Sequence, residues 1–584
     1  MSIWFLKVKN GWAGMALWQK MALAAFLLNF FLVAQLFLPN LADVNVWDES
    51  NYINSGKSFV EGGWPSYSWN PLVAALYGVF YLFTRQSPYW FLENLSLGRM
   101  VLFCLLWLAT YLVAKELRSI LHPAWLFGIA FVASLFTDIL GNPSDALFAS
   151  LAGLAFWQFL AFVQRQDWRN LAGASAFLGL AALSRNDGLI LFFVLLVLSF
   201  FLARGAKISL PKWGLAVILP FWLLVGGYVL SFWAARGTLE FGTPARSYIA
   251  FMQGHQIVYK REDGCELSFQ KCAVADAIAK YGSPEANDNS IFRAILNNPG
   301  AYAGRLKTIL FTLPEAFYQA YGTRLAYLYL LLSGIGLVSL LAARRFSLLL
   351  VLLGWPLYLG VYFLTFFRPG YLQSPFFILF ILSAFGLDYL VTQTQGGRKA
   401  WLWGGLLALA VLAGIWLQLP SLYFSAGVFL AAWLVTFLVG RAENFPANAF
   451  QMAAMCAFLV AGLLVRGNYP LLIGRTLGQI PEERALLVLE QSFQPGTMVG
   501  AGSRGVVQAA KLGYFSLASD GLVSLSADDL YASLQAADVK GIYVDGTLSN
   551  SNQTIWAMIE GDLGTRYETL YSDDEGSIRV LKVK

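Results

Sequence analysis

Charged residues are scarce in this chain. Asp, Glu, Lys and Arg make up only 13% of its 584 residues, whereas 58% are hydrophobic. A soluble protein of this length could not bury so much apolar surface, so the composition excludes that class and indicates a membrane protein with many spans. The net charge of +6 is small for the length, which argues against the basic footprint of a nucleic-acid-binding protein.

Histidine and cysteine are also rare, with two and four residues respectively. No histidine cluster accompanies the cysteines, so a zinc site is not favoured. Cys104 and Cys456 fall in apolar runs and are expected to be packing residues. Cys265 and Cys272 stand in a polar stretch and could form a disulfide if that stretch is extracytoplasmic. Because the chain has no dense acidic cluster, we expect no cofactor and a reaction that needs no metal. A divalent metal ion is the alternative that the sequence leaves open.

Long apolar runs alternate with basic clusters along the chain. Lys7, Lys9 and Lys20 precede the first run, about Met21 to Leu38, and the positive-inside rule places these lysines in the cytoplasm. Apolar runs that are long enough to span number about thirteen. The basic clusters between them fall on the sides of the membrane that this count requires. An odd count puts the N-terminus in the cytoplasm and the C-terminus outside. We therefore predict an α-helical polytopic protein of the cell (plasma or inner) membrane, with its transmembrane domain over residues 1–470.

Two connections stand out as extracytoplasmic loops, at about 39–97 and 235–322. In the first, the run Leu72 to Phe83 is apolar but too short to span, which predicts an interfacial or re-entrant helix. The second is long for a connection without a role of its own. It contains His255 and a predicted amphipathic helix from Tyr302 to Phe311.

The composition changes from about Gly474 onwards. Short β-like runs at Thr497 to Val499, Gly541 to Val544 and Ile578 to Val583 alternate with helical patterns. They predict a small soluble α/β domain over residues 474–584, on the extracytoplasmic side. The run Gly500 to Gly505 matches a dinucleotide fingerprint, but dinucleotides are scarce outside the cell, so we expect a Rossmann-like turn without a cofactor.

Charged and polar side chains gather at span ends that the topology places on the outer side. They come from four separate connections and are Asp48, Glu49, Asp145, Arg185, Asp187, Arg368 and Tyr371. Charges near lipid are costly, so by default they mark a function. Arginine binds phosphate through paired N–H donors, and a carboxylate can take a proton from a hydroxyl. Together these residues predict transfer of a group from a phosphate to an alcohol.

Several of these residues have a purely structural alternative. Asp145 is a helix N-cap, a substrate contact, or both. Asp187 either pairs with Arg185 or contacts substrate. Arg368 and Tyr371 are either membrane-interface anchors or ligands of the substrate, since both residue types are common at headgroup level. His255 is either an ordinary loop residue or a substrate contact.

The order of the motifs resembles a known group of enzymes. Asp48-Glu49-x-x-Tyr52 resembles the Asp-Glu motif of the GT-C superfamily of membrane glycosyltransferases, nearest to its protein O-mannosyltransferase and aminoarabinose transferase branch. Further similar segments follow in the same order: Asn70-Pro71-Leu72, Arg99, the run Gly179 to Arg185, and Arg368-x-x-Tyr371 followed by Pro375. The resemblance extends over roughly Met21 to Leu390.

The resemblance implies a GT-C fold and a hexosyl- or pentosyltransferase of cell-envelope glycosylation. Its donor would be a polyprenyl- or dolichyl-phosphate sugar, used at the outer face, usually with inversion. The acceptor hydroxyl would belong to a lipid, a glycan or a protein. Asn51 stands where aminoarabinose transferases tend to have a basic residue, so the resemblance does not extend to their lipid A acceptor.

The resemblance also implies roles for individual residues. Asp48 would be the base, Glu49 would hold acceptor or donor, and Asp145 would be a second acid near the acceptor. The donor phosphate would contact Arg185, Arg368 and Tyr371, and further substrate contacts would be Tyr52, Asp187 and His255.

Two other classes of protein compete with the enzyme. A transporter or flippase of lipid-linked saccharides should show internal repeats and polar residues at mid-membrane. This sequence shows no repeat, and its charges lie at span ends. A non-catalytic membrane scaffold would use the C-terminal domain as an interaction module, and would tolerate loss of Asp48 and Arg368.

Overall fold

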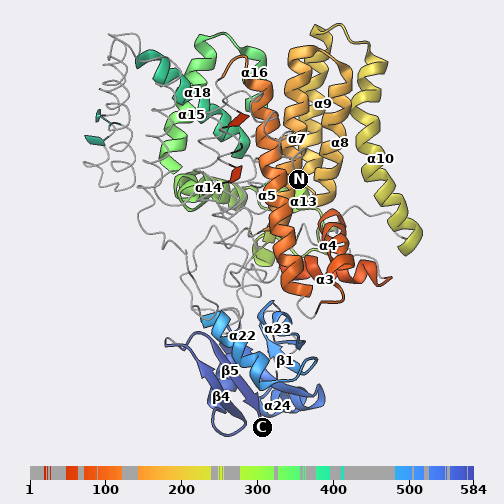
Figure 1. Ribbon diagram of the computed structural model, residues 1–584, viewed down its shortest axis with the longest axis vertical. Helices are drawn as coiled ribbons and strands as arrows, with labels where there is room; N and C mark the ends of the chain where they lie inside the picture. The colour runs from red at the N-terminus through yellow and green to blue at the C-terminus, as the bar shows by residue number, and fades with distance from the viewer. Residues whose placement is uncertain are drawn as a thin grey trace, which may run out of the picture.

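The computed structural model describes a helical part within residues 48–394 and a sheet-containing part within residues 481–584 (Figure 1). The described residues are 19–20, 23, 26–27, 48–62, 71–87, 90–121, 142–237, 248, 250–252, 254, 277–320, 326–354, 360, 362, 376–394, 405, 408–409, 411–412, 430, 481–502, 505–517, 522, 525–545, 548, 553–574 and 576–584.

The helical part is built from helices that run in both directions. Its described helices are α3 Asp48–Val60, α4 Pro71–Thr84, α5 Trp90–Leu117, α7 Pro143–Arg165, α8 Trp168–Ser184, α9 Gly188–Gly205, α10 Leu210–Arg236, α13 Ile291–Asn297, α14 Pro299–Ala320, α15 Ala326–Ala342, α16 Phe346–Gly354 and α18 Phe376–Thr394. Among the described residues, four helices (α5, α7, α9 and α10) contain segments long and apolar enough to cross a membrane. Of the first expected span, about Met21 to Leu38, the structure describes only residues 23, 26 and 27, so the count of thirteen stays a prediction.

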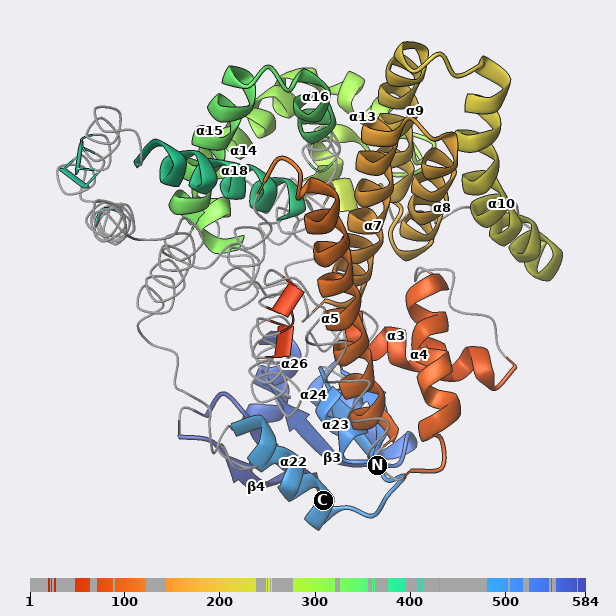
Figure 2. The same ribbon diagram turned by 45° about the horizontal axis from the view of Figure 1, so that its top comes forward.

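Consecutive helices α7 to α10 pack side by side through short turns (Figures 1 and 2). Asp167 caps the start of α8, because its side chain accepts a hydrogen bond from Arg169 N. At the other end of α8, a Cβ at Gly188 would overlap the backbone of Ala182, so the turn into α9 needs glycine. The chain therefore reverses within a few residues after each helix, and the end of α8 lies beside the starts of α7 and α9.

One end of the bundle is marked by a contact between two helix C-termini. Arg165 at the end of α7 pairs with Glu116 near the end of α5, with 2.6 Å between Arg165 Nη2 and Glu116 Oε2. Gln164 Nε2 also donates to the carbonyl of Glu116 at 3.0 Å. Since α5 and α7 are adjacent and end together, they begin together at the opposite end.

Helices α15 and α18 cross with their backbones in contact. A Cβ at Gly336 would overlap the carbonyl of Leu382, and one at Gly386 would overlap the carbonyl of Leu332. Ser333 Oγ lies 3.1 Å from Ser383 Oγ across the same crossing. Small residues at a helix crossing allow the close approach that stabilises helix pairs in a membrane.

The first predicted loop holds more helix than expected. The structure has a helix, α4, where Leu72 to Phe83 predicted one. Helix α3 was expected to be loop, and α5 begins at Trp90 rather than near Gly98. The sequence of α3 lacks a long apolar run, and the helix is supported by packing, because it buries Tyr52 and Ile53. Similarly, α14 is longer than the amphipathic helix predicted from Tyr302 to Phe311.

The sheet-containing part places helices on both faces of one sheet. Its elements are α22 Pro481–Ser492, β1 Met498–Ala501, α23 Gly505–Ala509, β2 Gly513–Ser516, α24 Ala527–Ala536, β3 Val539–Val544, α26 Gln553–Gly561, β4 Tyr567–Ser572 and β5 Arg579–Val583. The strand order is β2-β1-β3-β5-β4. β1 is parallel to β2 and β3, whereas β5 is antiparallel to β3 and β4.

Alternating strand residues supply the two faces of this sheet. Ile542 and Val544 of β3 belong to one apolar cluster, together with residues of α24 and α26. Tyr543 and Val580 point to the other face and join a cluster that includes residues of α22 and α23. That second cluster continues into the helical part. The β-like runs noted in the sequence overlap β1, β3 and β5, whereas β2 and β4 carried no such signal.

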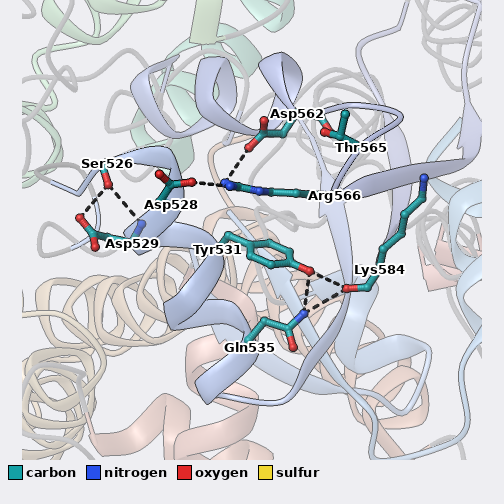
Figure 3. Close-up of polar contacts among 9 residues, drawn as sticks. All are labelled: Ser526, Asp528, Asp529, Tyr531, Gln535, Asp562, Thr565, Arg566 and Lys584. Carbon is teal, nitrogen blue, oxygen red and sulfur yellow. Dashed lines mark hydrogen bonds and ion pairs between the residues drawn. The ribbon is translucent and has the colours of Figure 1, made fainter.

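The start of β4 and the end of β5 are held to α24 by polar contacts (Figure 3). Arg566 forms ion pairs with Asp528 and with Asp562, the latter at 3.1 Å between Arg566 Nη1 and Asp562 Oδ2. The guanidinium lies over the ring of Tyr531, 5.0 Å from its centre. The Tyr531 hydroxyl donates to the carbonyl of Lys584 at 2.7 Å. These contacts lie on the side of the sheet that α24 covers, and Figure 1 shows α24 away from the helical part.

The sheet-containing part should become less stable at alkaline pH because of Tyr567 in β4, which is 1% exposed. Burial, together with the nearby Asp562 carboxylate, raises the pKa of Tyr567 to about 12. An unfolded tyrosine titrates near 10, so between these values the unfolded chain releases a proton that the folded chain keeps. Stability therefore falls as pH rises through this window, by roughly 2–3 kcal/mol in all.

Tyr567→Phe should remove this part of the pH dependence. Limited proteolysis of the full-length protein between pH 9 and 11.5 would follow loss of residues 481–584. The parent should become steeply more sensitive above pH 10, and Tyr567→Phe less steeply so. Equal slopes for the two proteins would contradict the prediction.

Candidate functional site

Three charged side chains meet at the end of the bundle where α7 and α9 begin and α8 ends. Arg185 is the C-cap residue of α8, and Asp187 is the N-cap residue of α9. Asp145 lies in the first turn of α7. The backbone holds the turn between α8 and α9, because Gly188 N donates to the carbonyl of Arg185 at 2.9 Å.

Contacts of Arg185 join these residues to a fourth, Tyr362. Arg185 Nη1 forms an ion pair with Asp145, and Arg185 Nε donates to Asp187 Oδ2 at 2.7 Å. The Tyr362 hydroxyl donates to the same Asp187 oxygen at 2.5 Å. Arg185 Nη2 donates to the Tyr362 hydroxyl at 3.4 Å. We call these four residues, Asp145, Arg185, Asp187 and Tyr362, the Arg185 cluster.

The Arg185 cluster is largely removed from solvent. The side chains of Arg185, Asp145 and Asp187 are 14%, 10% and 18% exposed. Charges buried to this degree are tolerated when they are paired and hydrogen-bonded, as they are here. The helix dipoles favour the same arrangement, since both carboxylates lie at helix N-termini and the guanidinium lies at a C-terminus.

The charges of the cluster do not balance. Two carboxylates and one guanidinium sum to a net charge of −1 when all three are ionised. Arg185 is therefore held in a fixed orientation, but its charge is offset by its neighbours. A phosphate that bound here would need a further cation, or would need one carboxylate to turn away.

The structure shows the partners of Asp187 and Asp145, whereas their contact with substrate stays a prediction. Asp187 does pair with Arg185. Of the alternatives for Asp145, the N-cap is wrong, because Asn142 occupies the N-cap position of α7. Asp145 instead pairs with Arg185, 40 residues later in the chain. Proline is favoured as the first residue of a helix, because the N–H that it lacks would have no partner there. Helix α7 begins at Pro143, so Asp145 lies inside its first turn.

Sequence reasoning missed Tyr362. It is 4% exposed and lies 175 positions from Asp187 in the chain. It stands in an apolar run in which tyrosine is an ordinary residue, so neither spacing nor composition distinguishes it. Its hydroxyl became recognisable only through the partners that it contacts.

The remaining predicted residues are described to different degrees. Asp48 and Glu49 are the first two residues of α3. Tyr52, on the same helix, is 5% exposed and packs in the core, and its contact with substrate stays a prediction. Outside the described residues lie Arg368, Tyr371, His255, Cys265 and Cys272.

Helices α3 and α4 lie at the same end of the bundle as the Arg185 cluster (Figures 1 and 2). Tyr81 of α4 packs edge-on against Trp90, the first residue of α5, with 5.2 Å between ring centres. Since α5 and α7 begin at the same end, α4 lies near the start of α7, and it also contacts α8. In the described part of the chain, no group of three or more His, Cys, Asp or Glu residues could hold a metal ion, and metal dependence stays a prediction.

Comparisons with known proteins find this fold among solved structures. ArnT from Cupriavidus metallidurans bound to undecaprenyl phosphate aligns over 97% of this chain and 98% of its own, with a TM-score of 0.54 at 15% sequence identity. The Archaeoglobus fulgidus oligosaccharyltransferase in the apo form aligns over 96% of this chain and 73% of its own, with a TM-score of 0.48 at 13% identity. No protein-family model and no curated protein matches the sequence.

The likeness to ArnT shows the fold. ArnT is an aminoarabinose transferase of the GT-C superfamily, and its alignment covers nearly the whole of both chains. The GT-C resemblance that the sequence motifs predicted is therefore confirmed at the level of fold.

Proposed function

We propose that the protein is a glycosyltransferase that moves a sugar from a polyprenyl-phosphate donor to an acceptor hydroxyl at the extracytoplasmic membrane face, with inversion at the sugar carbon. One observation carries the proposal. In a chain with the fold of ArnT, the helix that begins with Asp48 and Glu49 lies at the same end of the bundle as Arg185. A base and a phosphate ligand are the two groups that this reaction needs at one place.

The reaction follows from these groups. Asp48 takes the proton of the acceptor hydroxyl, whose oxygen forms a bond to the anomeric carbon of the sugar. The bond between that carbon and the phosphate oxygen breaks, and the polyprenyl phosphate leaves with the electron pair. Glu49 holds the acceptor or the donor sugar beside Asp48. Cationic donors stabilise the negative charge that develops on the departing phosphate.

The Arg185 cluster suggests how the cationic residues divide this work. Asp145, Asp187 and Tyr362 hold the Arg185 guanidinium, so it loses little freedom when a phosphate binds. The two carboxylates offset its charge. We therefore expect Arg368 to supply most of the attraction for the donor phosphate, with Tyr371 as a hydrogen-bond donor, and Arg185 to set its orientation.

A donor assay tests the proposal. Purified protein in detergent would be given radiolabelled polyprenyl-phosphate sugars one at a time, together with a lipid extract as the source of acceptor. Release of bare polyprenyl phosphate, with the label passing to a new product, is the expected result for at least one donor. Movement of an intact donor across vesicles without release would favour a flippase. Neither movement nor release with any donor would favour a non-catalytic scaffold.

A further inference from the structure

Helix α3, which begins with Asp48, is held on one side by α4. A Cβ at Gly56 would lie 2.5 Å from Gly78 N and 2.7 Å from the carbonyl oxygen of Ala74. Both atoms belong to the backbone of α4, so neither can move aside as a flexible side chain would. The two helices are therefore in backbone contact, and α3 has little freedom on this side.

On another side, α3 is paired with the sheet-containing part of the chain. Asn54 Nδ2 donates to Gln508 Oε1 at 2.8 Å, and Gln508 Nε2 donates back to Asn54 Oδ1 at 3.3 Å. The two residues are 454 positions apart in the chain. Both side chains are partly buried. Two reciprocal hydrogen bonds between amides fix direction as well as distance, because each amide both donates and accepts.

Gln508 presents its amide from a firmly held position. It lies on α23, whose Val506, Val507 and Ala509 are buried in the apolar cluster that continues into the helical part. The same cluster contains Ile53, the neighbour of Asn54 on α3. α23 also contacts α5, and both views show it beside the end of α5 that lies near α3 (Figures 1 and 2). The sheet-containing part is thus packed against α3 and α5.

The Asn54–Gln508 pair can affect the position of the first residues of α3, because this helix has only 13 residues. Asn54 follows Asp48 by six positions on one continuous helix, which is about 9 Å along the helix axis. A tilt of α3 at Asn54 therefore shifts Asp48 as well. A displacement of about 1 Å in a catalytic group can lower a rate by up to about 10²-fold.

We propose that Gln508 is a positioning residue: by pairing with Asn54, it docks the sheet-containing part onto α3 and fixes the place of Asp48. This inference rests on the proposed function, in which Asp48 is the base. It assigns residues 481–584 a part in the reaction through one contact, without a cofactor or ligand of their own.

A residue swap tests the pair. Asn54→Gln lengthens one side chain by a methylene and Gln508→Asn shortens the other, so each single variant spoils the geometry. The double variant restores the summed length. We expect kcat to fall about tenfold in each single variant and in Gln508→Ala, the effect of losing one or two net hydrogen bonds. The double variant should return to within about threefold of the parent. Donor Kd should stay within about twofold in all of them.

Gln535→Ala is the matched control. Gln535 lies on α24 of the same sheet-containing part, where its Nε2 donates to the carbonyl of Lys584 at 3.0 Å (Figure 3). Its kcat should equal that of the parent. If Gln508→Ala also matches the parent, or if the double variant is no better than the single ones, the proposal is wrong.

Hydrogen exchange separates this inference from the proposed function. In full-length Gln508→Ala, the amides of residues 48–60 should exchange several-fold faster than in the parent and in Gln535→Ala. This readout needs no substrate, so it holds even if no donor is ever consumed. Unchanged exchange over residues 48–60 would overturn the positioning role, whatever the donor assay shows.

Discussion

Asp48→Asn is expected to lower the rate of sugar transfer by roughly 10²–10⁴-fold, the usual contribution of a general base. Asparagine keeps the size of aspartate and still accepts a hydrogen bond, but it cannot take the proton from the acceptor hydroxyl. Asp48 is the first residue of α3, where loss of the carboxylate costs the helix at most about 1 kcal/mol. The loss should therefore come from the chemical step, with the fold intact.

Single-turnover kinetics on bound donor would measure that step, and a separate binding titration would give donor Kd. Donor Kd should change by less than about threefold, because the phosphate ligands are untouched. Asp538→Asn is a suitable control. Asp538 has a side chain that is 81% exposed and a φ of 53°, a conformation that asparagine adopts readily. Normal turnover in Asp48→Asn would remove Asp48 as the base.

Arg185→Gln is expected to destabilise the protein by about 3–5 kcal/mol, as happens when one partner of a buried ion pair is removed. It would leave the carboxylates of Asp145 and Asp187 without their shared partner, in a place where each side chain is less than one-fifth exposed. Thermal unfolding in detergent should show a large fall in Tm. Arg293→Gln, which breaks a pair with both side chains at least 60% exposed, should cost no more than about 1 kcal/mol.

A triple variant separates the structural role of Arg185 from its proposed role at the donor phosphate. Adding Asp145→Asn and Asp187→Asn to Arg185→Gln replaces the three charges with neutral side chains of similar shape. Most of the lost stability should return, since the unpaired charges are gone. Transfer activity should stay low, because no guanidinium orients the phosphate. If activity returns with stability, Arg185 serves the fold and not the donor.

The apolar composition and the basic clusters were enough to predict a helical membrane protein, because hydrophobic length and flanking charge are local properties of the chain. The same holds for the helix at Leu72 to Phe83 and for the strands β1, β3 and β5, where a run of residues carries its own pattern. The order of the motifs was also enough to predict the GT-C fold.

The geometry around the candidate site depends on contacts that have no local pattern. Arg185 meets Asp145 across 40 positions, Tyr362 meets Asp187 across 175, and Gln508 meets Asn54 across 454. No window of sequence contains both members of such a pair, so periodicity and motif spacing do not predict these contacts. Helix α3 was missed for the same reason: its residues form a helix because α4, α5 and α23 pack around them. Composition and local pattern could identify the class of protein, whereas the partners of each polar side chain emerged only from the folded chain.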